Sequence, residues 1–140
     1  MRVILDSNIL FSALISSVGP PHRIYVAWRS KKFELATCSI QIEEMRRASR
    51  YTKLRDILTP REVGRLINDL HGALQIDVLA RDHETADPDD AWLLALADKS
   101  RAEYLVTGDK RAGLLSRRRI GPTRIMTATA FCRVALREGR

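Results

Sequence analysis

The segment VILDSNILF, residues 3–11, joins two short apolar runs through a polar break. Val3, Ile4 and Leu5 have the composition of a buried strand, and the polar residues 6–8 that follow are typical of its end. The apolar residues 9–11 then indicate the start of a helix. The segment therefore predicts a strand that leads directly into a helix.

The alternation of strands and helices continues along the chain. Further strands are expected at 33–37, 76–79, 104–106 and 124–126, and helices at 22–32, 39–49, 59–74, 87–96 and 127–137. The helix at 59–74 has the clearest start, since Thr59 supplies a capping hydroxyl, Pro60 the first position and Glu62 the third. The pattern predicts an α/β fold, a three-layer α/β/α sandwich with a mainly parallel central sheet.

Composition indicates a globular protein. The 140 residues suit one domain spanning 1–140, with 45% hydrophobic and 29% charged residues. Residues 1–15 are apolar, but Asp6 and Asn8 interrupt them, and no cleavage site for a signal peptide follows. We therefore expect a soluble, cytoplasmic protein without a membrane segment. Cys38 and Cys132 share no metal-binding or redox spacing, so we expect two buried thiols.

The chain is strongly basic, with a net charge of +7 and a pI near 10.0. Such a charge favours a polyanionic partner. Two groups of basic residues stand out, around 46–55 and around 110–119. The residues that we expect to contact phosphates are Arg46, Arg47, Arg50, Lys110 and Arg111, with Lys53, Arg55, Arg117, Arg118 and Arg119 beside them.

Four acidic residues, Asp6, Glu44, Asp90 and Asp109, each lie beyond one of the first four expected strands. In a parallel sheet with helical crossovers the carboxyl ends of the strands share one edge, so these side chains are expected to converge. Converging carboxylates repel one another unless they share a proton or a cation, and Mg²⁺ is a common partner. The pattern predicts a metal-dependent enzyme that acts on an anionic substrate.

Each acid also has a purely structural explanation. Asp6 suits a helix cap, Asp90 suits the electrostatics of a helix start, and Asp109 suits a turn. Glu43 and Glu44 suit ion pairs with arginines on the same helix. The joint position of all four acids after successive strands favours the shared site, because unrelated acids would also occur at the opposite edge.

Three stretches resemble motifs of the PIN-domain family, the nuclease domain of VapC-type toxins of bacterial toxin–antitoxin pairs. They are VILDSNIL at 3–10, DAWLLALA at 90–97 and YLVTGDK at 104–110. The likeness extends over nearly the whole chain, to IMTATAF at 125–131. The stretch RYTKLR at 50–55 and the helix after Thr59 are most similar to the subgroup described as toxins of the PIN family.

The resemblance implies hydrolysis of RNA by water activated by Mg²⁺ or Mn²⁺, leaving a 5′-phosphate and a 3′-hydroxyl. It implies that Asp6 and Asp90 contact the metal directly, that Glu44 is a base or a ligand through water, and that Asp109 is an outer ligand. Asn8 and Thr107 are candidates for orienting these carboxylates by hydrogen bonds. A homodimer and a small antitoxin that blocks the site are also implied.

Some positions in this pattern have competing candidates. Met45 after Glu44 matches the family better than Glu44 after Glu43, which favours Glu44. The third acid is Asp87, Asp89 or Asp90, and the apolar helix that begins at Ala91 favours Asp90. Lys110, Arg111 and Ala112 occupy the place where many relatives have a further aspartate, so a second metal has less support than a first.

Two other functions remain open. A phosphatase of the haloacid dehalogenase type also begins with a strand that ends in aspartate, but it needs a second aspartate where this chain has Asn8. A PIN module that binds RNA without cleaving it would keep the fold and lose turnover. Retention of all four acids favours the enzyme.

Overall fold

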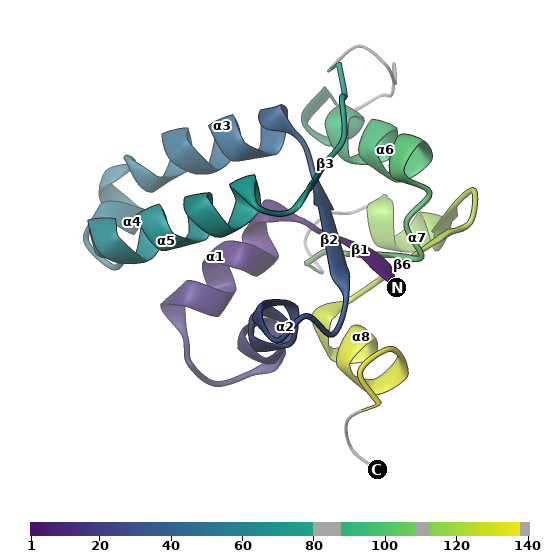
Figure 1. The fold of residues 1–140 in the computed structure, drawn as a ribbon, viewed down its shortest axis with the longest axis horizontal. Helices are drawn as coiled ribbons and strands as arrows, with labels where there is room; N and C mark the ends of the chain where they lie inside the picture. Colours follow the sequence, from purple (N-terminus) through teal and green to yellow (C-terminus); the bar gives the residue numbers. More distant parts are fainter. Residues whose placement is uncertain (80–87, 109–112, 138–140) are drawn as a thin grey trace.

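A mainly parallel sheet forms the centre of the molecule (Figure 1). Its strands have the order β3-β2-β1-β4-β6-β5. The structure, a computed structural model, describes residues 1–79, 88–108 and 113–137. In these ranges the strands are β1 Arg2–Leu5, β2 Glu34–Thr37, β3 Leu74–Gln75, β4 Tyr104–Val106, β5 Arg119–Ile120 and β6 Thr123–Met126. Every neighbouring pair is parallel except β5 and β6, which are antiparallel.

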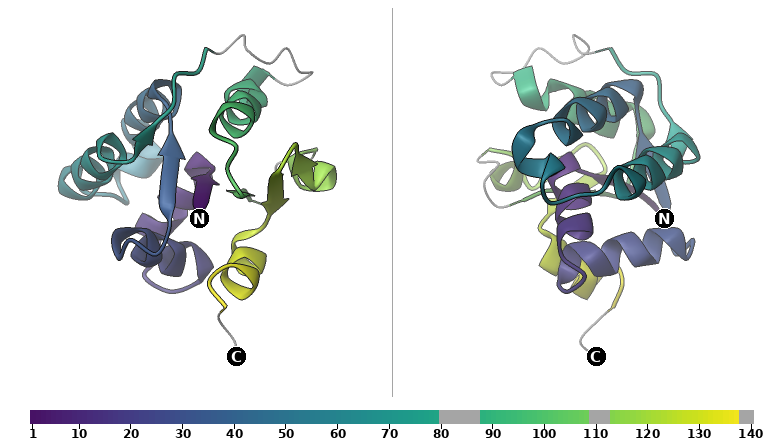
Figure 2. Two further views of the ribbon diagram at one scale, coloured as in Figure 1. Left: turned by 45° about the vertical axis from the view of Figure 1, so that its right-hand side comes forward. Right: turned by 90° about the vertical axis from the view of Figure 1, so that its left-hand side faces the viewer.

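Helices cover both faces of the sheet (Figure 2). They are α1 Ser7–Ile15, α2 Pro20–Arg29, α3 Ser39–Ser49, α4 Thr52–Arg55, α5 Pro60–His71, α6 Pro88–Ser100, α7 Leu114–Arg117 and α8 Ala128–Val134. One core contains residues of α1, α2, α3, α5 and α8, and a second core contains residues of α6 and α7. The three-layer α/β/α sandwich expected from the sequence is confirmed.

The strands divide their side chains between the two cores by simple alternation. Val3 and Leu5 of β1 belong to the core under α1 and α2, whereas Ile4 between them belongs to the core under α6. Val106 and Leu105 of β4 divide in the same way. Strands that are buried on both faces need apolar residues at successive positions, which explains the unbroken run at 3–5.

The helix start at Thr59 is confirmed. The Thr59 hydroxyl accepts a hydrogen bond from the Glu62 backbone N–H at 3.1 Å, and Glu62 Oε1 accepts from the Thr59 backbone N–H at 3.1 Å. This reciprocal capping box begins α5 with Pro60 in its first turn. The helix ends at His71, three residues earlier than expected.

The third strand lies earlier than the sequence indicated. We expected 76–79, but β3 comprises only Leu74 and Gln75, which pair with Ala36 and Thr37 of β2. The Ile76 backbone N–H still donates to the Thr37 carbonyl at 2.9 Å, and the chain then leaves the sheet. Ile76 and Val78 pack against the core under α6. Their alternation therefore comes from a loop that covers this core, which gives the same pattern as a strand.

Three short elements were not expected. No clear apolar period marks α4, α7 or β5, which contain four, four and two residues. They are rich in lysine and arginine. Segments this short are stabilised by their neighbours more than by their own propensity, because helix nucleation is unfavourable.

In the part of the chain that the structure describes, no helix is long and apolar enough to cross a membrane. Cys38 and Cys132 are both buried, as expected, and they form no disulfide.

Candidate active site

Asp6 lies immediately beyond β1, at the carboxyl edge of the sheet, and none of its surface is exposed to solvent. Its backbone N–H donates to the Val106 carbonyl at 2.9 Å, so the pairing of β1 with β4 continues to this residue. Its side-chain Oδ2 accepts a hydrogen bond of 2.8 Å from the Thr107 hydroxyl. The ends of β1 and β4 are therefore joined through a buried carboxylate.

The capping explanation for Asp6 does not hold. The residue has the position of the N-cap of α1, with φ −58° and ψ 145°, but its side chain makes no capping hydrogen bond to the first turn of that helix. The carboxylate turns to Thr107 instead. Burying a carboxylate costs free energy that hydrogen bonds or a cation must offset, so the arrangement indicates more than a strand end.

Thr107 lies just past β4 and is also fully buried. Its backbone N–H donates to the Met126 carbonyl at 3.0 Å, which fixes the residue to the end of β6. The Thr107 hydroxyl thus donates to one of the carboxylates that we expected it to contact. Its role in orienting a catalytic acid stays a prediction.

Gln41 is a buried polar residue that the sequence analysis missed. Its Nε2 donates to the Leu5 carbonyl at 2.7 Å and lies 3.5 Å from the Ser7 hydroxyl, while its Oε1 accepts from the Thr37 hydroxyl at 2.6 Å. Gln41 is only 1% exposed. These bonds attach the first turns of α3 to the chain on either side of Asp6. The available signal was a glutamine on the apolar face of a helix, four residues before the buried Met45.

Glu43 and Glu44 have different surroundings. Glu43 is exposed and pairs with Arg46 at 3.3 Å, as expected for a solvated helix face. Glu44 is half-buried and lies one helical turn beyond Gln41. Among the described residues it has no ion pair. Of the two glutamates, Glu44 is thus the one whose carboxylate has no arginine partner among the described residues.

The negative charge of Glu44 also affects a buried side chain beside the start of α3, the thiol of Cys38. Burial raises the pKa of the Cys38 thiol, and the negative charge of Glu44 raises it further, against backbone hydrogen bonds from Gln41 and Ile40 that lower it. Cys38 ends the loop between β2 and α3. Its thiol therefore stays neutral and adds no second negative charge close to Glu44.

The structure describes the other candidate residues only in part. The backbones of Asp89 and Asp90 lie in the first turn of α6, but their side chains lie outside what the structure describes, as does all of Asp87. Asp109, Lys110 and Arg111 lie outside it completely. Asn8 is exposed on α1, and within the described ranges its side chain has no hydrogen bond. Of the two candidates for orienting the acids, only Thr107 contacts Asp6.

Residues 1–79, 88–108 and 113–137 contain no group of three or more His, Cys, Asp or Glu side chains close enough to hold a metal ion. Of the four expected acids, Asp6 and Glu44 have side chains in these ranges, whereas the side chains of Asp90 and Asp109 lie outside them.

Arg46, Arg47 and Arg50 are exposed near the end of α3. Arg46 is already engaged, because it pairs with Glu43 and its Nη2 lies 3.1 Å from His71 Nε2 on α5. Basic residues at this end also interact favourably with the helix dipole. Part of this group therefore has a structural role, whether or not it also contacts phosphates.

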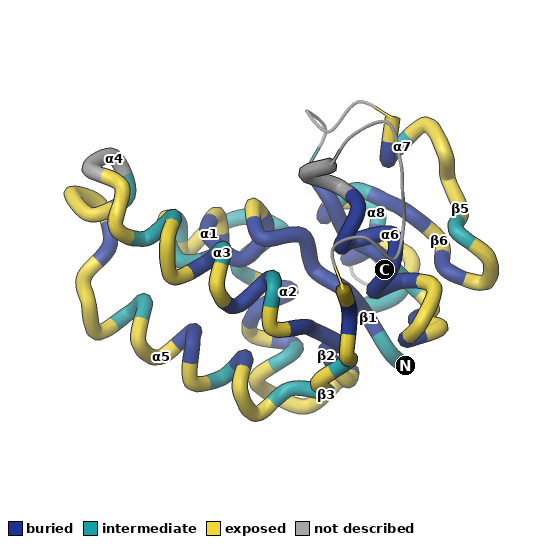
Figure 3. Tube along the Cα trace, turned by 90° about the horizontal axis from the view of Figure 1, so that it is seen from above, coloured by how far each residue is buried: buried dark blue, intermediate teal, exposed yellow. Residues whose placement is uncertain are grey.

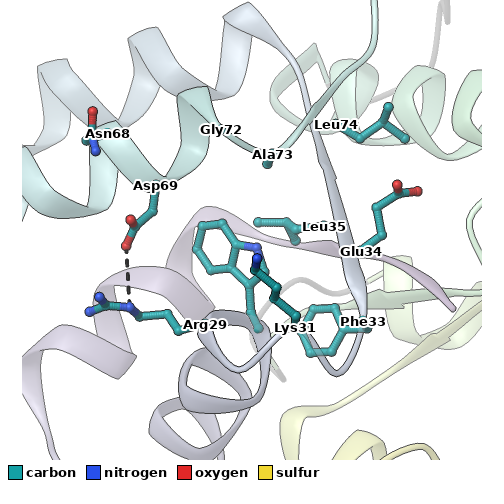
Figure 4. Close-up of a pocket in the computed structure, with 11 residues that line it drawn as sticks. Arg29, Lys31, Phe33, Glu34, Leu35, Asn68, Asp69, Gly72, Ala73 and Leu74 are labelled. Atoms are coloured by element: carbon teal, nitrogen blue, oxygen red, sulfur yellow. Dashed lines mark ion pairs between the residues drawn. The ribbon is translucent and has the colours of Figure 1, made fainter.

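A large hollow lies elsewhere (Figure 4). It has a volume of about 600 Å³ and is lined by the end of α2, the start of β2 and the end of α5. Asp69 on its wall pairs with Arg29 at 3.8 Å and accepts a hydrogen bond from the buried Tyr25 hydroxyl at 3.0 Å. The hollow borders the amino end of β2, whereas Asp6 follows the carboxyl end of β1, so the two belong to opposite edges of the sheet.

The sheet order and the helices on both faces define a three-layer α/β/α domain. The family model described as PIN domain matches residues 2–111. The chain therefore belongs to the PIN-domain family, a family of nuclease domains, and the resemblance seen in the sequence is confirmed.

Among solved structures the chain is similar to the crystal structure of VapBC2 from Rickettsia felis bound to a DNA fragment from their promoter. The TM-score is 0.55 at 17% sequence identity, over 91% of this chain and 98% of that chain. At this identity the likeness concerns the fold. Comparison with curated proteins gave no match.

Proposed function

We propose that this protein is a metal-dependent endoribonuclease that hydrolyses RNA phosphodiester bonds with Mg²⁺ or Mn²⁺. The observation that supports the proposal most is the buried Asp6 carboxylate, held by Thr107 at the carboxyl edge of the sheet. Ligands of open α/β sheets bind at this edge. Membership of the PIN-domain family supports the same chemistry.

The chemistry of the donors suits a hard divalent ion. Mg²⁺ and Mn²⁺ prefer carboxylate oxygens, and a fully buried carboxylate is stabilised by a nearby cation. We assign direct metal contacts to Asp6 and Asp90, a contact through water or a role as base to Glu44, and an outer role to Asp109. When bound, the ion lowers the pKa of a water molecule and stabilises charge on the phosphate.

The residues of the chain perform the remaining work. Thr107 holds the Asp6 carboxylate in one orientation through its hydroxyl. Glu44 takes a proton from the attacking water, whose oxygen bonds to phosphorus while the bond from phosphorus to the 3′ oxygen breaks. The 3′ oxygen takes a proton from solvent water and leaves as a hydroxyl, and the phosphate stays on the 5′ end of the other fragment.

Partners form a second part of the proposal. We infer that the protein is the toxin of a toxin–antitoxin pair, bound and inhibited by a small antitoxin, and that it forms a homodimer. The similar solved structure is of VapBC2, a complex bound to promoter DNA, which supports an antitoxin for a protein of this fold. The four acids are then the residues that an antitoxin has to cover.

The test is an RNA cleavage assay with the purified protein, on a mixed panel of RNAs, with Mg²⁺, with Mn²⁺ and with chelator. We expect cleavage with either metal and none with chelator. Asp6→Asn should lower the rate by at least about 100-fold, because it removes a charged ligand and leaves the fold intact. Asp77→Asn is the matched control, since Asp77 is an exposed acid near β3 that has no assigned role.

Three results would contradict the proposal. Full activity of Asp6→Asn at unchanged metal concentration would remove Asp6 from the site. Binding of RNA without cleavage under every metal condition would favour a non-catalytic RNA-binding module. A covalent aspartyl-phosphate formed from small phosphoesters would favour the phosphatase, despite the exposed Asn8 at the position of its second acid.

A further inference from the structure

Two arginines face each other across the β5–β6 hairpin. Arg119 pairs with Arg124 in the antiparallel register, and both residues are exposed. Residues at such positions have Cβ atoms about 5 Å apart, and like charges there are destabilising. Arg117, at the end of α7, and Arg118, which follows it, are exposed as well. We call Arg117, Arg118, Arg119 and Arg124 the arginine face.

The arginine face has no acidic partner within the part of the chain that the structure describes. Three arginines elsewhere do have such a partner. Arg2 pairs with Glu34 at 2.8 Å, Arg29 pairs with Asp69 at 3.8 Å, and Arg46 pairs with Glu43 at 3.3 Å. What distinguishes the arginine face is that four neighbouring positive charges have no acidic partner among residues 1–79, 88–108 and 113–137.

Protection of a sheet edge explains only part of this arrangement. Charged residues on an edge strand discourage pairing with other chains, and β5 is an edge strand. Arg124 is not on the edge, because β6 lies between β4 and β5. The Arg124 guanidinium also lies over the Tyr104 ring, 5.7 Å from its centroid, which restricts its position. A charge kept on an inner strand and held by an aromatic ring indicates a binding function.

The chemistry of the face suits phosphates. All four residues are arginines, whose planar guanidinium groups bind phosphate oxygens through two hydrogen bonds, whereas lysine acts as a point charge. The planes of exposed guanidinium groups can also stack on unpaired bases. A single-stranded nucleic acid offers both a phosphate chain and base surfaces, which a flexible acidic peptide does not.

Arg119 and Arg124 are level with Tyr104 and Val3, three residues before Asp6 along the strands. The Arg118 carbonyl accepts a hydrogen bond from the Ile125 N–H, Met126 bonds to Thr107, and Thr107 bonds to Asp6. Three strand spacings of about 4.8 Å and three residues of about 3.3 Å separate the backbones of Arg119 and Asp6, a distance of roughly 17 Å. This span corresponds to about five nucleotides of a stacked strand at ~3.4 Å each.

We propose that the arginine face binds the phosphate backbone of the RNA strand a few nucleotides from the bond that is cleaved. The proposal rests on the proposed function only for the identity of that strand as substrate. Binding at this face fixes the register of the RNA on the sheet edge and leaves the chemical step to the acids. The face is a positioning site, so its loss affects substrate binding rather than turnover.

The test uses Arg119→Gln/Arg124→Gln and the control Arg61→Gln/Arg65→Gln, which removes two exposed arginines from α5 at the other end of the molecule (Figure 3). Binding of a labelled single-stranded RNA is measured by fluorescence anisotropy in chelator, where no cleavage occurs. The first variant also loses a repulsive cross-strand pair, so it should unfold at a temperature no lower than the wild type.

We expect weaker RNA binding and a smaller salt dependence for the β5–β6 variant alone. Loss of two phosphate contacts reduces the slope of log affinity against log salt by about 1.4 for single strands. The affinity advantage of the wild type should therefore shrink about sevenfold between about 50 mM and about 200 mM salt. In the cleavage assay, KM should rise while kcat is unchanged.

Equal effects of the two double variants, or no effect of either, would overturn the proposal, because bulk charge would then account for the binding. So would binding of polyglutamate, but not RNA, that depends on Arg119 and Arg124, because the partner would then be an acidic protein segment. If the protein cleaves RNA with unchanged KM in the variant, the arginine face is wrong and the function stands. If it binds RNA through the face and never cleaves it, the function is wrong and the face stands.

Discussion

At the scale of single residues, the central interaction is one hydrogen bond between two buried side chains, Asp6 and Thr107. The Asp6 carboxylate has two oxygens, and the Thr107 hydroxyl holds one of them at 2.8 Å. A hydrogen bond to an ionised carboxylate is stronger than one between neutral groups and fixes the plane of the acid. The same bond thus stabilises the fold and sets how Asp6 is presented.

Replacement of Thr107 separates these two effects. Thr107→Val keeps the shape of the side chain but removes the hydroxyl, so Asp6 loses a donor and we expect the protein to lose about 1–3 kcal/mol of stability. We also expect metal affinity to fall, so that half-maximal cleavage needs an about 10–100-fold higher Mn²⁺ concentration in a metal titration. Thr107→Ser keeps the hydroxyl and should restore most metal affinity. If Val and Ser variants need the same metal concentration as the wild type, Thr107 is only structural.

Tyr25 provides a second prediction at this scale, far from the acids. Burial, followed by the negative charge of Asp69 and a hydrogen bond to it, raises the pKa of Tyr25 to about 12 from about 10. The folded state therefore holds the phenol proton more tightly than the unfolded state. This contribution to stability is complete below about pH 10 and is lost as pH rises towards 12.

Tyr25→Phe has no such proton to lose. The difference in unfolding free energy between wild type and Tyr25→Phe should therefore fall by about 1.3 kcal/mol between about pH 9 and about pH 11, measured by urea denaturation. Neutral-pH stability should be lower in the variant, because Asp69 loses its 3.0 Å hydrogen bond. A constant difference across that range would mean that Tyr25 titrates normally.

At the scale of secondary structure, Gln41 links α3 to two strands. It bonds to the Leu5 carbonyl at the end of β1 and to the Thr37 hydroxyl at the end of β2. Glu44 lies one turn further along the same helix. Ile42 and Met45 pack α3 into the core, and the buried Gln41 amide adds hydrogen bonds that fix the position of α3, and of Glu44 on it, relative to the strand ends beside Asp6.

Gln41→Leu should destabilise the protein by about 1–3 kcal/mol, since it leaves the Thr37 hydroxyl and the Leu5 carbonyl without this buried partner. The further change Thr37→Val removes the stranded hydroxyl and should recover part of that loss. If Gln41 positions Glu44, kcat stays low in the double variant although stability improves. Recovery of kcat in proportion to stability would show that Gln41 contributes to folding alone.

The order of elements was predictable where apolar periods are long or caps are explicit. The capping box at Thr59 and Glu62 and the buried run at 3–5 have local causes that a sequence displays directly. β3 was misplaced because a loop packed on the core alternates like a strand. β5 was missed because its pairing with β6 depends on a neighbour rather than on its own two residues.

The candidate site was predictable where its residues directly follow buried strands. Asp6 and Thr107 follow buried strands, so the sheet topology alone brings them together. Gln41 was not predictable with confidence from position alone, because a lone glutamine on a helix is usually exposed, and its partners lie 4 and 36 residues away in sequence. Long-range hydrogen bonds of this kind leave no local pattern.

At the scale of the whole molecule, the proposed site would gather negative charge in a protein whose net charge is +7. Carboxylates gathered at the sheet edge would repel one another, and a divalent ion would relieve that repulsion. The ion would do so only in the folded state, because the proposed site exists only there. Metal binding should therefore be visible as stability, independently of any cleavage.

A ligand that binds only the folded state stabilises it by RT ln(1 + [L]/Kd), which is about 2.7 kcal/mol at 100 times Kd. For a chain of 140 residues this corresponds to a rise in Tm of roughly 10 °C. We expect such a rise with Mn²⁺ or Mg²⁺ for the wild type and for Asp77→Asn, measured by calorimetry against NaCl of equal ionic strength. Without metal, Asp6→Asn should have a Tm close to or above that of the wild type, since one repelling charge is gone. With metal, its Tm should rise far less than that of the wild type. An equal gain in Asp6→Asn would mean that the ion binds elsewhere, and that the acids beyond the strands do not form one site.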